Sequence, residues 1–173
     1  MLINLTDILS SEGKIEEKAV SFEADVFTCQ HGTFPLVDKS QVKLKLTNVG
    51  QGKAIIEANF QVQLVMSCDR CLKEVLVPLQ INLMEEVSEK NIESPANADE
   101  QSYLEGYQLD VDQLIGNEIL MNWPTKVLCS EDCKGICTNC GRDLNLGDCG
   151  CDTFVPDPRM AVIKDIFNAN KEV

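Results

Sequence analysis

Apolar and polar residues alternate along three stretches in the first half of the chain. They alternate through QVKLKLTNV (41–49), the apolar residues take the even positions over 60–66, and they take the odd positions over 75–83. Alternation of this length indicates antiparallel strands with one buried face. The last two stretches flank the motif CDRC, from Cys68 to Cys71, so we predict a hairpin with CDRC at its tip.

The chain changes character at residue 88. Residues 88–106 are acidic, contain Pro95 and show no periodicity, which is typical of an exposed linker or mobile loop. Asp110 has the features of a helix N-cap, and apolar residues at helical spacing follow it until the helix stops before Pro124. The residues expected on the buried face of this helix are Val111, Leu114, Ile115 and Ile119.

A last helix is expected near the C-terminus. Asp157 would cap it, and Pro158 would stand at its first position, where proline is favoured. Met160, Ile163 and Phe167 recur at helical spacing, so we expect this helix to pack on the body.

The sequence therefore predicts an α+β fold. An antiparallel β-rich body with a CxxC hairpin tip is expected over residues 1–87, followed by the acidic linker over 88–106. The part from 107 to 173 is expected to hold the first helix, a zinc-ribbon-like cysteine-rich segment and the C-terminal helix.

Length and composition are those of a folded protein. The chain has 173 residues, of which 44% are apolar, and no apolar run approaches the ~18 residues that a membrane span needs. The start, MLINLTDILSSEGK, has neither a basic leader nor a small-residue cleavage site, so no signal peptide is expected. We therefore expect a cytoplasmic protein whose thiols stay reduced.

The charge is strongly negative. The chain has 28 acidic and 15 basic residues, for a formal net charge of −13. Because Lys and Arg drive phosphate binding, this charge argues against non-specific binding to RNA or DNA. A basic protein partner suits it better. Acidity that serves only solubility explains the charge equally well.

The cysteines are the most specific chemical signal. Eight of the nine form four close pairs, which are Cys68 with Cys71, Cys129 with Cys133, Cys137 with Cys140, and Cys149 with Cys151. A tight C-x-x-C turn directs two sulfurs to one point, and four thiolates commonly hold structural zinc. Gly141 follows Cys140 where such a turn often needs a left-handed residue. The four pairs therefore predict two four-cysteine zinc sites.

The grouping of the pairs is less constrained than their number. We favour one compact site from the last two pairs, because the eight residues between Cys140 and Cys149 are enough for a short hairpin. The first two pairs would then join the CDRC hairpin to the C-terminal segment. A rival grouping combines the two middle pairs. C-x-C is also a less common zinc pair than C-x-x-C, so either Cys149 or Cys151 is a candidate for a cysteine that is not a metal ligand.

Three other roles for the thiols stay open. C-x-x-C is a redox motif at a helix N-terminus, whereas CDRC joins two strands. Four thiolates also hold iron–sulfur clusters, and the thiols can equally be unligated. The isolated Cys29 is most simply a core residue.

No other residue suggests catalysis. His31 is the single histidine and has no paired base or nucleophile in the sequence, and Trp123 is expected to anchor the core. The sequence contains no P-loop, nucleophile elbow, dinucleotide-binding glycine motif or zinc-protease motif. We therefore expect a protein that is not an enzyme and has no catalytic residue.

At this point the sequence resembles the bacterial YceD family. The resemblance lies in SCDRCL between two strands, in LCSEDCKGICTNCGRDLNLGDCGC, and in DPR at the start of the last helix. It covers roughly residues 14–168. Ile136 and Thr138 depart from the family pattern, and neither departure affects a thiol. The family is associated with accumulation of large-subunit ribosomal RNA and has relatives in chloroplasts.

The resemblance implies a role in making the large ribosomal subunit and implies no catalytic activity. The negative charge favours contact with a precursor of that subunit through a basic ribosomal protein, or through a local RNA contact. Lys134, Arg142 and Arg159 are the candidate partner contacts, and each is equally explained as a solvated surface charge. A small-molecule substrate and a membrane are not expected.

Three classes of function follow. The first is a non-enzymatic, zinc-stabilised factor in large-subunit biogenesis. The second is a general zinc-binding adaptor such as a transcription-associated protein. The third, which the residues support least, is a thiol oxidoreductase.

Overall fold

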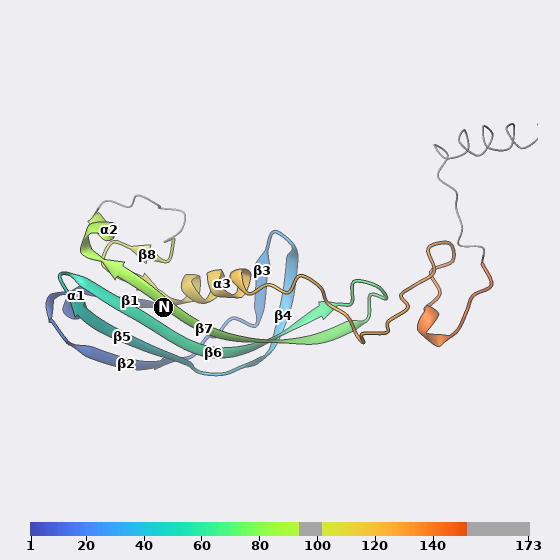
Figure 1. Cartoon of the computed structure of the whole chain (residues 1–173), viewed down its shortest axis with the longest axis horizontal. Coiled ribbons are helices and arrows are strands. Elements are labelled where there is room, and N and C mark those ends of the chain that lie inside the picture. The colour runs from blue at the N-terminus through green and yellow to red at the C-terminus, as the bar shows by residue number, and fades with distance from the viewer. Residues whose placement is uncertain (94–101, 152–173) are drawn as a thin grey trace, which may run out of the picture. The chain divides into compact units, whose positions relative to one another are not determined.

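The computed structural model describes residues 1–93 and 102–151 (Figure 1). The chain divides into two compact units. The first consists of Met1–Ser67 and Glu74–Val127, and the second consists of Cys68–Lys73 and the chain from Leu128 onward. The expected last helix, with Asp157, Pro158 and Arg159, lies outside the described residues.

Most regular structure belongs to the first unit. Its strands are β1 (Leu2–Asn4), β2 (Ile15–Val20), β3 (Val26–Cys29), β4 (Gly32–Lys39), β5 (Val42–Gly50), β6 (Lys53–Ser67), β7 (Glu74–Ser88), β8 (Leu104–Glu105) and β9 (Gln108–Asp110). Its helices are α1 (Thr6–Ser10), α2 (Glu89–Glu93) and α3 (Val111–Met121), and the second unit has the 3₁₀ turn η1 (Leu144–Leu146).

The β6–β7 hairpin confirms the prediction from the alternating residues. The two strands pair antiparallel along their full length, from Lys53 opposite Ser88 to Ser67 opposite Glu74. β6 also pairs with β5 and β4 in the larger sheet, while β1, β9 and β8 form a separate three-stranded sheet. The CDRC motif therefore lies in the connection between the two longest strands.

The core lies on one face of the large sheet, where α3 packs (Figure 1). The even-numbered residues of β6 from Ala54 to Met66 are buried, as are the four residues predicted on α3. The Asp110 side chain accepts hydrogen bonds from the backbone N–H groups of Asp112 and Gln113, which confirms it as the N-cap. Within the described residues, no helix is long and apolar enough to cross a membrane.

The structure divides the chain differently from the expected boundaries. α3 belongs to the unit that contains the sheet, because Leu114, Ile115 and Ile119 join its core. The described parts of the segment expected as a linker contain α2 and β8, and Tyr103 is buried there. Burial of one aromatic side chain and pairing of a two-residue strand leave no periodic signal in the sequence.

Asn48 is a polar residue at an inward-facing position of β5. It is 4% exposed. Its Nδ2 donates to the carbonyls of Ile8 and Leu9 at the end of α1, and its Oδ1 accepts from the backbone N–H of Gly50. These carbonyls lack a partner within the helix, so one side chain ends α1 and holds it on the sheet.

We predict that Asn48→Ala lowers the free energy of unfolding of the first unit by about 3 kcal/mol, because it leaves buried donors and acceptors without partners. Urea unfolding followed by the fluorescence of Trp123, the single tryptophan, measures this change. The neighbouring Val49→Thr, at an exposed position, should change it by only about 0.5 kcal/mol. Equal effects of both substitutions would show that Asn48 does not hold α1.

Candidate metal centres

The structure brings the eight paired cysteines together in two groups of four. The first cysteine group is Cys68, Cys71, Cys129 and Cys133, and the second cysteine group is Cys137, Cys140, Cys149 and Cys151. Within each group the sulfurs lie within 4.8 Å of one another. This is the grouping favoured from the sequence, and both Cys149 and Cys151 take part in it. All nine cysteines, each in the described part of the chain, are free of disulfides.

The first two cysteines of each group lie on turns of the same backbone geometry. In the CDRC turn, the N–H of Cys68 donates to the carbonyl of Lys73, and the carbonyl of Cys68 accepts from the N–H of Leu72. In the second turn, Cys137 makes the same two hydrogen bonds, with Arg142 and Gly141. Both are tight knuckles that leave N–H groups facing the sulfurs.

The spacing of the sulfurs suits a tetrahedral metal ion. Two sulfur pairs of the first group, Cys68–Cys133 and Cys71–Cys129, are 3.8 and 3.5 Å apart. A tetrahedron with Zn–S bonds of about 2.3 Å places its sulfurs about 3.8 Å apart. Each group can therefore hold one metal ion with four thiolates.

The thiols of the first group differ in acidity. Burial raises the pKa of Cys68, but the backbone N–H groups of Arg70, Cys71 and Cys129 outweigh it and bring the pKa to about 6. For Cys71, the backbone N–H of Lys73 lowers the pKa, but burial and the neighbouring sulfurs raise it to about 12. The surroundings therefore favour the thiolate form of Cys68 and the protonated form of Cys71.

The second group shows the same contrast. The backbone N–H groups of Cys140 and Asn139 lower the pKa of Cys137 to about 6. The sulfurs of Cys140 and Cys149 raise the pKa of Cys151 to about 12. A divalent cation replaces protons in such a set, because thiolates rather than thiols are metal ligands.

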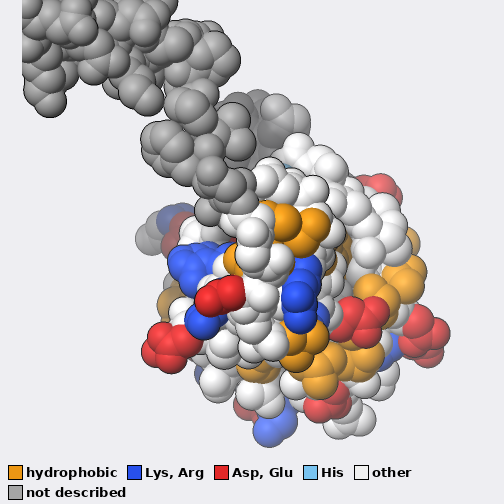
Figure 2. Space-filling model, turned by 90° about the vertical axis from the view of Figure 1, so that its right-hand side faces the viewer, with side chains coloured by type: hydrophobic (Ala, Val, Ile, Leu, Met, Phe, Trp, Pro, Cys, Tyr) orange, Lys and Arg blue, Asp and Glu red, His pale blue; other side chains and the backbone are white. Residues whose placement is uncertain are grey.

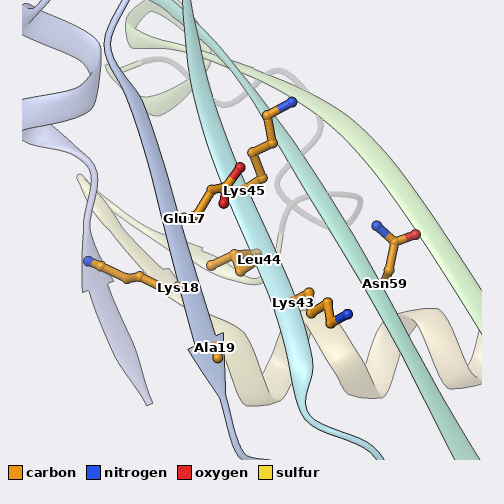
Figure 3. Close-up of a pocket in the computed structure, with 7 residues that line it drawn as sticks. All are labelled: Glu17, Lys18, Ala19, Lys43, Leu44, Lys45 and Asn59. Atoms are coloured by element: carbon orange, nitrogen blue, oxygen red, sulfur yellow. The ribbon is translucent and has the colours of Figure 1, made fainter.

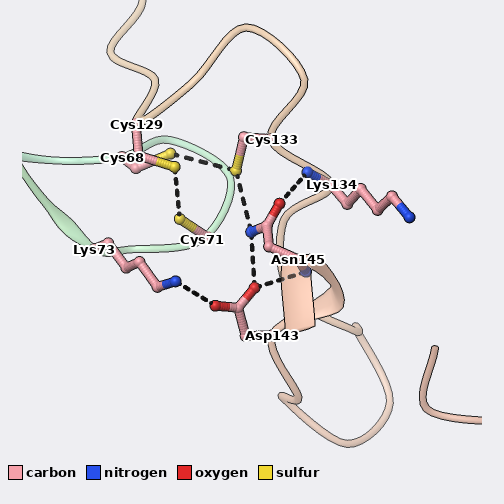
Figure 4. A network of polar contacts seen from close by, with 8 residues as sticks. All are labelled: Cys68, Cys71, Lys73, Cys129, Cys133, Lys134, Asp143 and Asn145. Carbon is pink, nitrogen blue, oxygen red and sulfur yellow. Dashed lines mark hydrogen bonds and ion pairs between the residues drawn. The ribbon is translucent and has the colours of Figure 1, made fainter. Parts of the chain in front are cut away.

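A polar network links the loop of the second group to the first group (Figure 4). Asn145 Nδ2 lies 3.5 Å from Cys133 Sγ, and Asn145 Oδ1 accepts from the backbone N–H of Lys134. Asp143 accepts from Asn145 and forms a 2.7 Å ion pair with Lys73, on the CDRC turn. The loop that separates Cys140 from Cys149 therefore orients a sulfur of the other group.

Backbone contacts reinforce this link. The N–H of Ile136 donates to the carbonyl of Arg70, and the Arg70 guanidinium donates to the carbonyl of Cys133. Gly135 has φ of 81°, and a Cβ at this position would come within 3.0 Å of the Arg70 carbonyl oxygen. Only glycine fits this approach without displacing backbone.

The sequence did not indicate Asp143, Asn145 or Lys73. The residues between Cys140 and Cys149 were expected to form a short hairpin, but they contain η1, with Asp143 accepting from the N–H of Asn145 at its start. Asp and Asn favour such local turns, and this preference was the available signal. It does not reveal which sulfur Asn145 contacts.

Two of the predicted partner contacts lie beside the cysteines. Lys134 and Arg142 have exposed side chains in the second unit, next to Cys133 and Gly141, while Arg159 lies outside the described residues. Cys29 is half-buried against the core of the first unit. Trp123 packs there against Phe27 and Phe34, and His31 stacks on it.

The first unit also has a depression of about 330 Å³ over β2, β5 and β6 (Figure 3). Glu17, Lys43 and Asn59 are exposed among its lining residues, and Lys45 is paired with Glu57. The lining contains no nucleophile beside a base. It resembles the ordinary polar face of a sheet, and we assign no chemistry to it.

The sequence model of the family described as "Large ribosomal RNA subunit accumulation protein YceD" matches residues 56–167. The match includes β6 from Ile56 onward, β7, α3 and all eight grouped cysteines. No curated protein and no solved structure matches the chain.

We predict that the metal-free protein takes up two zinc ions per chain and that each ion releases at least one proton near pH 7. The release is expected because Cys71 and Cys151, with pKa values of about 12, are protonated until metal binds. Zinc affinity should therefore fall as the pH is lowered. Titration with zinc in weakly buffered solution measures the zinc ions bound and the protons released per chain. Zinc uptake without proton release would contradict the expected thiol ligands.

We predict that Asn145→Ala weakens zinc binding at the first cysteine group by about 10–100-fold, the usual effect of removing a group that orients a ligand. Competition with a chelator measures the affinity. Leu146→Ala is the matched control, because Leu146 is the neighbouring residue of η1 and is 78% exposed. Equal affinities of the two variants would show that the contact of Asn145 with Cys133 contributes nothing.

Proposed function

Because this chain belongs to the YceD family of large ribosomal RNA subunit accumulation proteins, we propose that it is a non-enzymatic, zinc-stabilised factor in large-subunit biogenesis. The observation that carries the proposal is the family match, which covers most of the hairpin and both cysteine groups. The two four-cysteine groups support a structural role for the metal.

Zinc is the ion that we propose for both groups. Structural zinc sites commonly use four thiolates, whereas catalytic zinc keeps a coordination position for water or substrate. With all four cysteines of a group bound, the ion has no such position. The metal would therefore hold the fold of the second unit and take no part in chemistry.

A basic partner is the second part of the proposal. The formal net charge is −13, and each zinc ion with four thiolates adds negative charge. On the face in Figure 2, Lys and Arg side chains stand beside Asp and Glu rather than forming one basic surface. This arrangement favours a basic ribosomal protein, or a surface where protein already covers RNA. Lys134, Arg142 and Arg159 are the residues for a local RNA contact.

We predict that the purified protein binds large-subunit precursor particles, that binding weakens as salt rises, and that protein-free ribosomal RNA binds little near physiological salt. Co-sedimentation measures all three. Neutralising Lys134 and Arg142 together tests the local RNA contact.

The outcomes separate the functional classes. Tight binding to protein-free RNA that the double variant abolishes would replace the basic protein partner with an RNA contact. Failure to bind particles, together with normal large-subunit RNA in a strain that lacks the gene, would exclude the biogenesis function. A general zinc-binding adaptor would then be the better account.

A further inference from the structure

The two knuckles have the same backbone conformation at one position but carry different residue types there. Leu72 and Gly141 both donate their N–H to the first cysteine of the turn, over 2.9 and 2.8 Å. Both have positive φ, of 63° and 71°. This left-handed conformation is easy for glycine and unfavourable for leucine, whose Cβ crowds the backbone. The chain thus uses glycine in one knuckle and keeps leucine at the same position of the other.

Burial does not account for Leu72. Its side chain is 64% exposed, so among the described residues it gains little from leaving water. A residue that is unfavourable for the local backbone and takes no part in the described core suggests a role in contact with another molecule.

We propose that Leu72 is the apolar anchor by which the CDRC knuckle docks into a hydrophobic pocket on a basic protein of the large-subunit precursor. This inference rests on the proposed function and names the contact residue. Asp69, Glu131 and Asp132 are exposed in the segments that form the first cysteine group, and four thiolates around one zinc ion add negative charge. The pocket that receives Leu72 should therefore have a positively charged rim.

The cations nearest to Leu72 in sequence favour protein over RNA as the partner. The Arg70 guanidinium donates to the carbonyl of Cys133, and Lys73 is paired with Asp143. Both groups already serve contacts within the second unit. Leu72 is an exposed leucine, and the two cations closest to it in the sequence already have partners. It is therefore suited to an apolar pocket and poorly suited to phosphates.

The test compares variants that keep the knuckle but change the exposed side chain. Leu72→Gly introduces the residue type of the second knuckle, and Leu72→Asn is polar and tolerates positive φ. Leu72→Met keeps an apolar side chain. Leu76→Thr is the matched control, because Leu76 is a 56% exposed leucine on β7. The Gly and Asn variants should keep the zinc content of the unmodified protein, and their thermal midpoints should equal or exceed its thermal midpoint.

Binding to purified large-subunit precursor particles is the measurement. We expect Leu72→Gly and Leu72→Asn to weaken binding by about tenfold or more, whereas Leu72→Met and Leu76→Thr stay close to the unmodified protein. If the unmodified protein binds and all variants bind equally, the anchor is overturned while the proposed function stands. If the unmodified protein does not bind particles, the proposed function fails and the anchor fails with it. Binding to protein-free RNA that depends on Leu72 would overturn the protein partner.

Discussion

In the second unit, cysteine sulfurs come together four at a time in two groups. Among its described residues, every buried hydrophobic side chain is a cysteine, namely Cys68, Cys71, Cys133 and Cys137. Within residues 68–73 and 128–151, the apolar core that stabilises the first unit has no counterpart. With a metal ion bound in each group, as we propose, metal–thiolate bonds would take the place of apolar burial in the described part of this unit, and the free energy of metal binding would contribute to folding.

This constraint explains the polar contacts around the sulfurs. The N–H groups of the knuckles and the amide of Asn145 stabilise negative charge on the sulfurs of Cys68 and Cys133. The Asp143–Lys73 ion pair and the close approach of Gly135 to Arg70 hold together segments that are distant in sequence. Because Asp143 and Asn145 lie in the loop of the second cysteine group, the order of each group depends partly on the other.

Sequence reasoning succeeds where a signal is local and periodic. Alternation over the strands that became β6 and β7, the N-cap at Asp110 and the spacing of the thiols each depend on neighbouring residues, and each agrees with the structure. Asn48 contacts a residue 40 positions away and Asn145 a cysteine 12 positions away, and asparagine has no diagnostic spacing at either position. The sequence does not indicate the left-handed conformation of Leu72 either, because leucine rarely adopts it.

Hydrogen exchange of Cys71→Ser tests the central claim most directly. In the first cysteine group, Cys71 and Cys129 are separated by 58 positions, so one metal ion would join the CDRC turn to the segment after Leu128. Loss of one ligand should speed exchange of the backbone amides of Cys133 and Ile136 as well as those of Cys68 and Leu72. Faster exchange confined to the CDRC turn would contradict the account, because the two segments would then not share a metal.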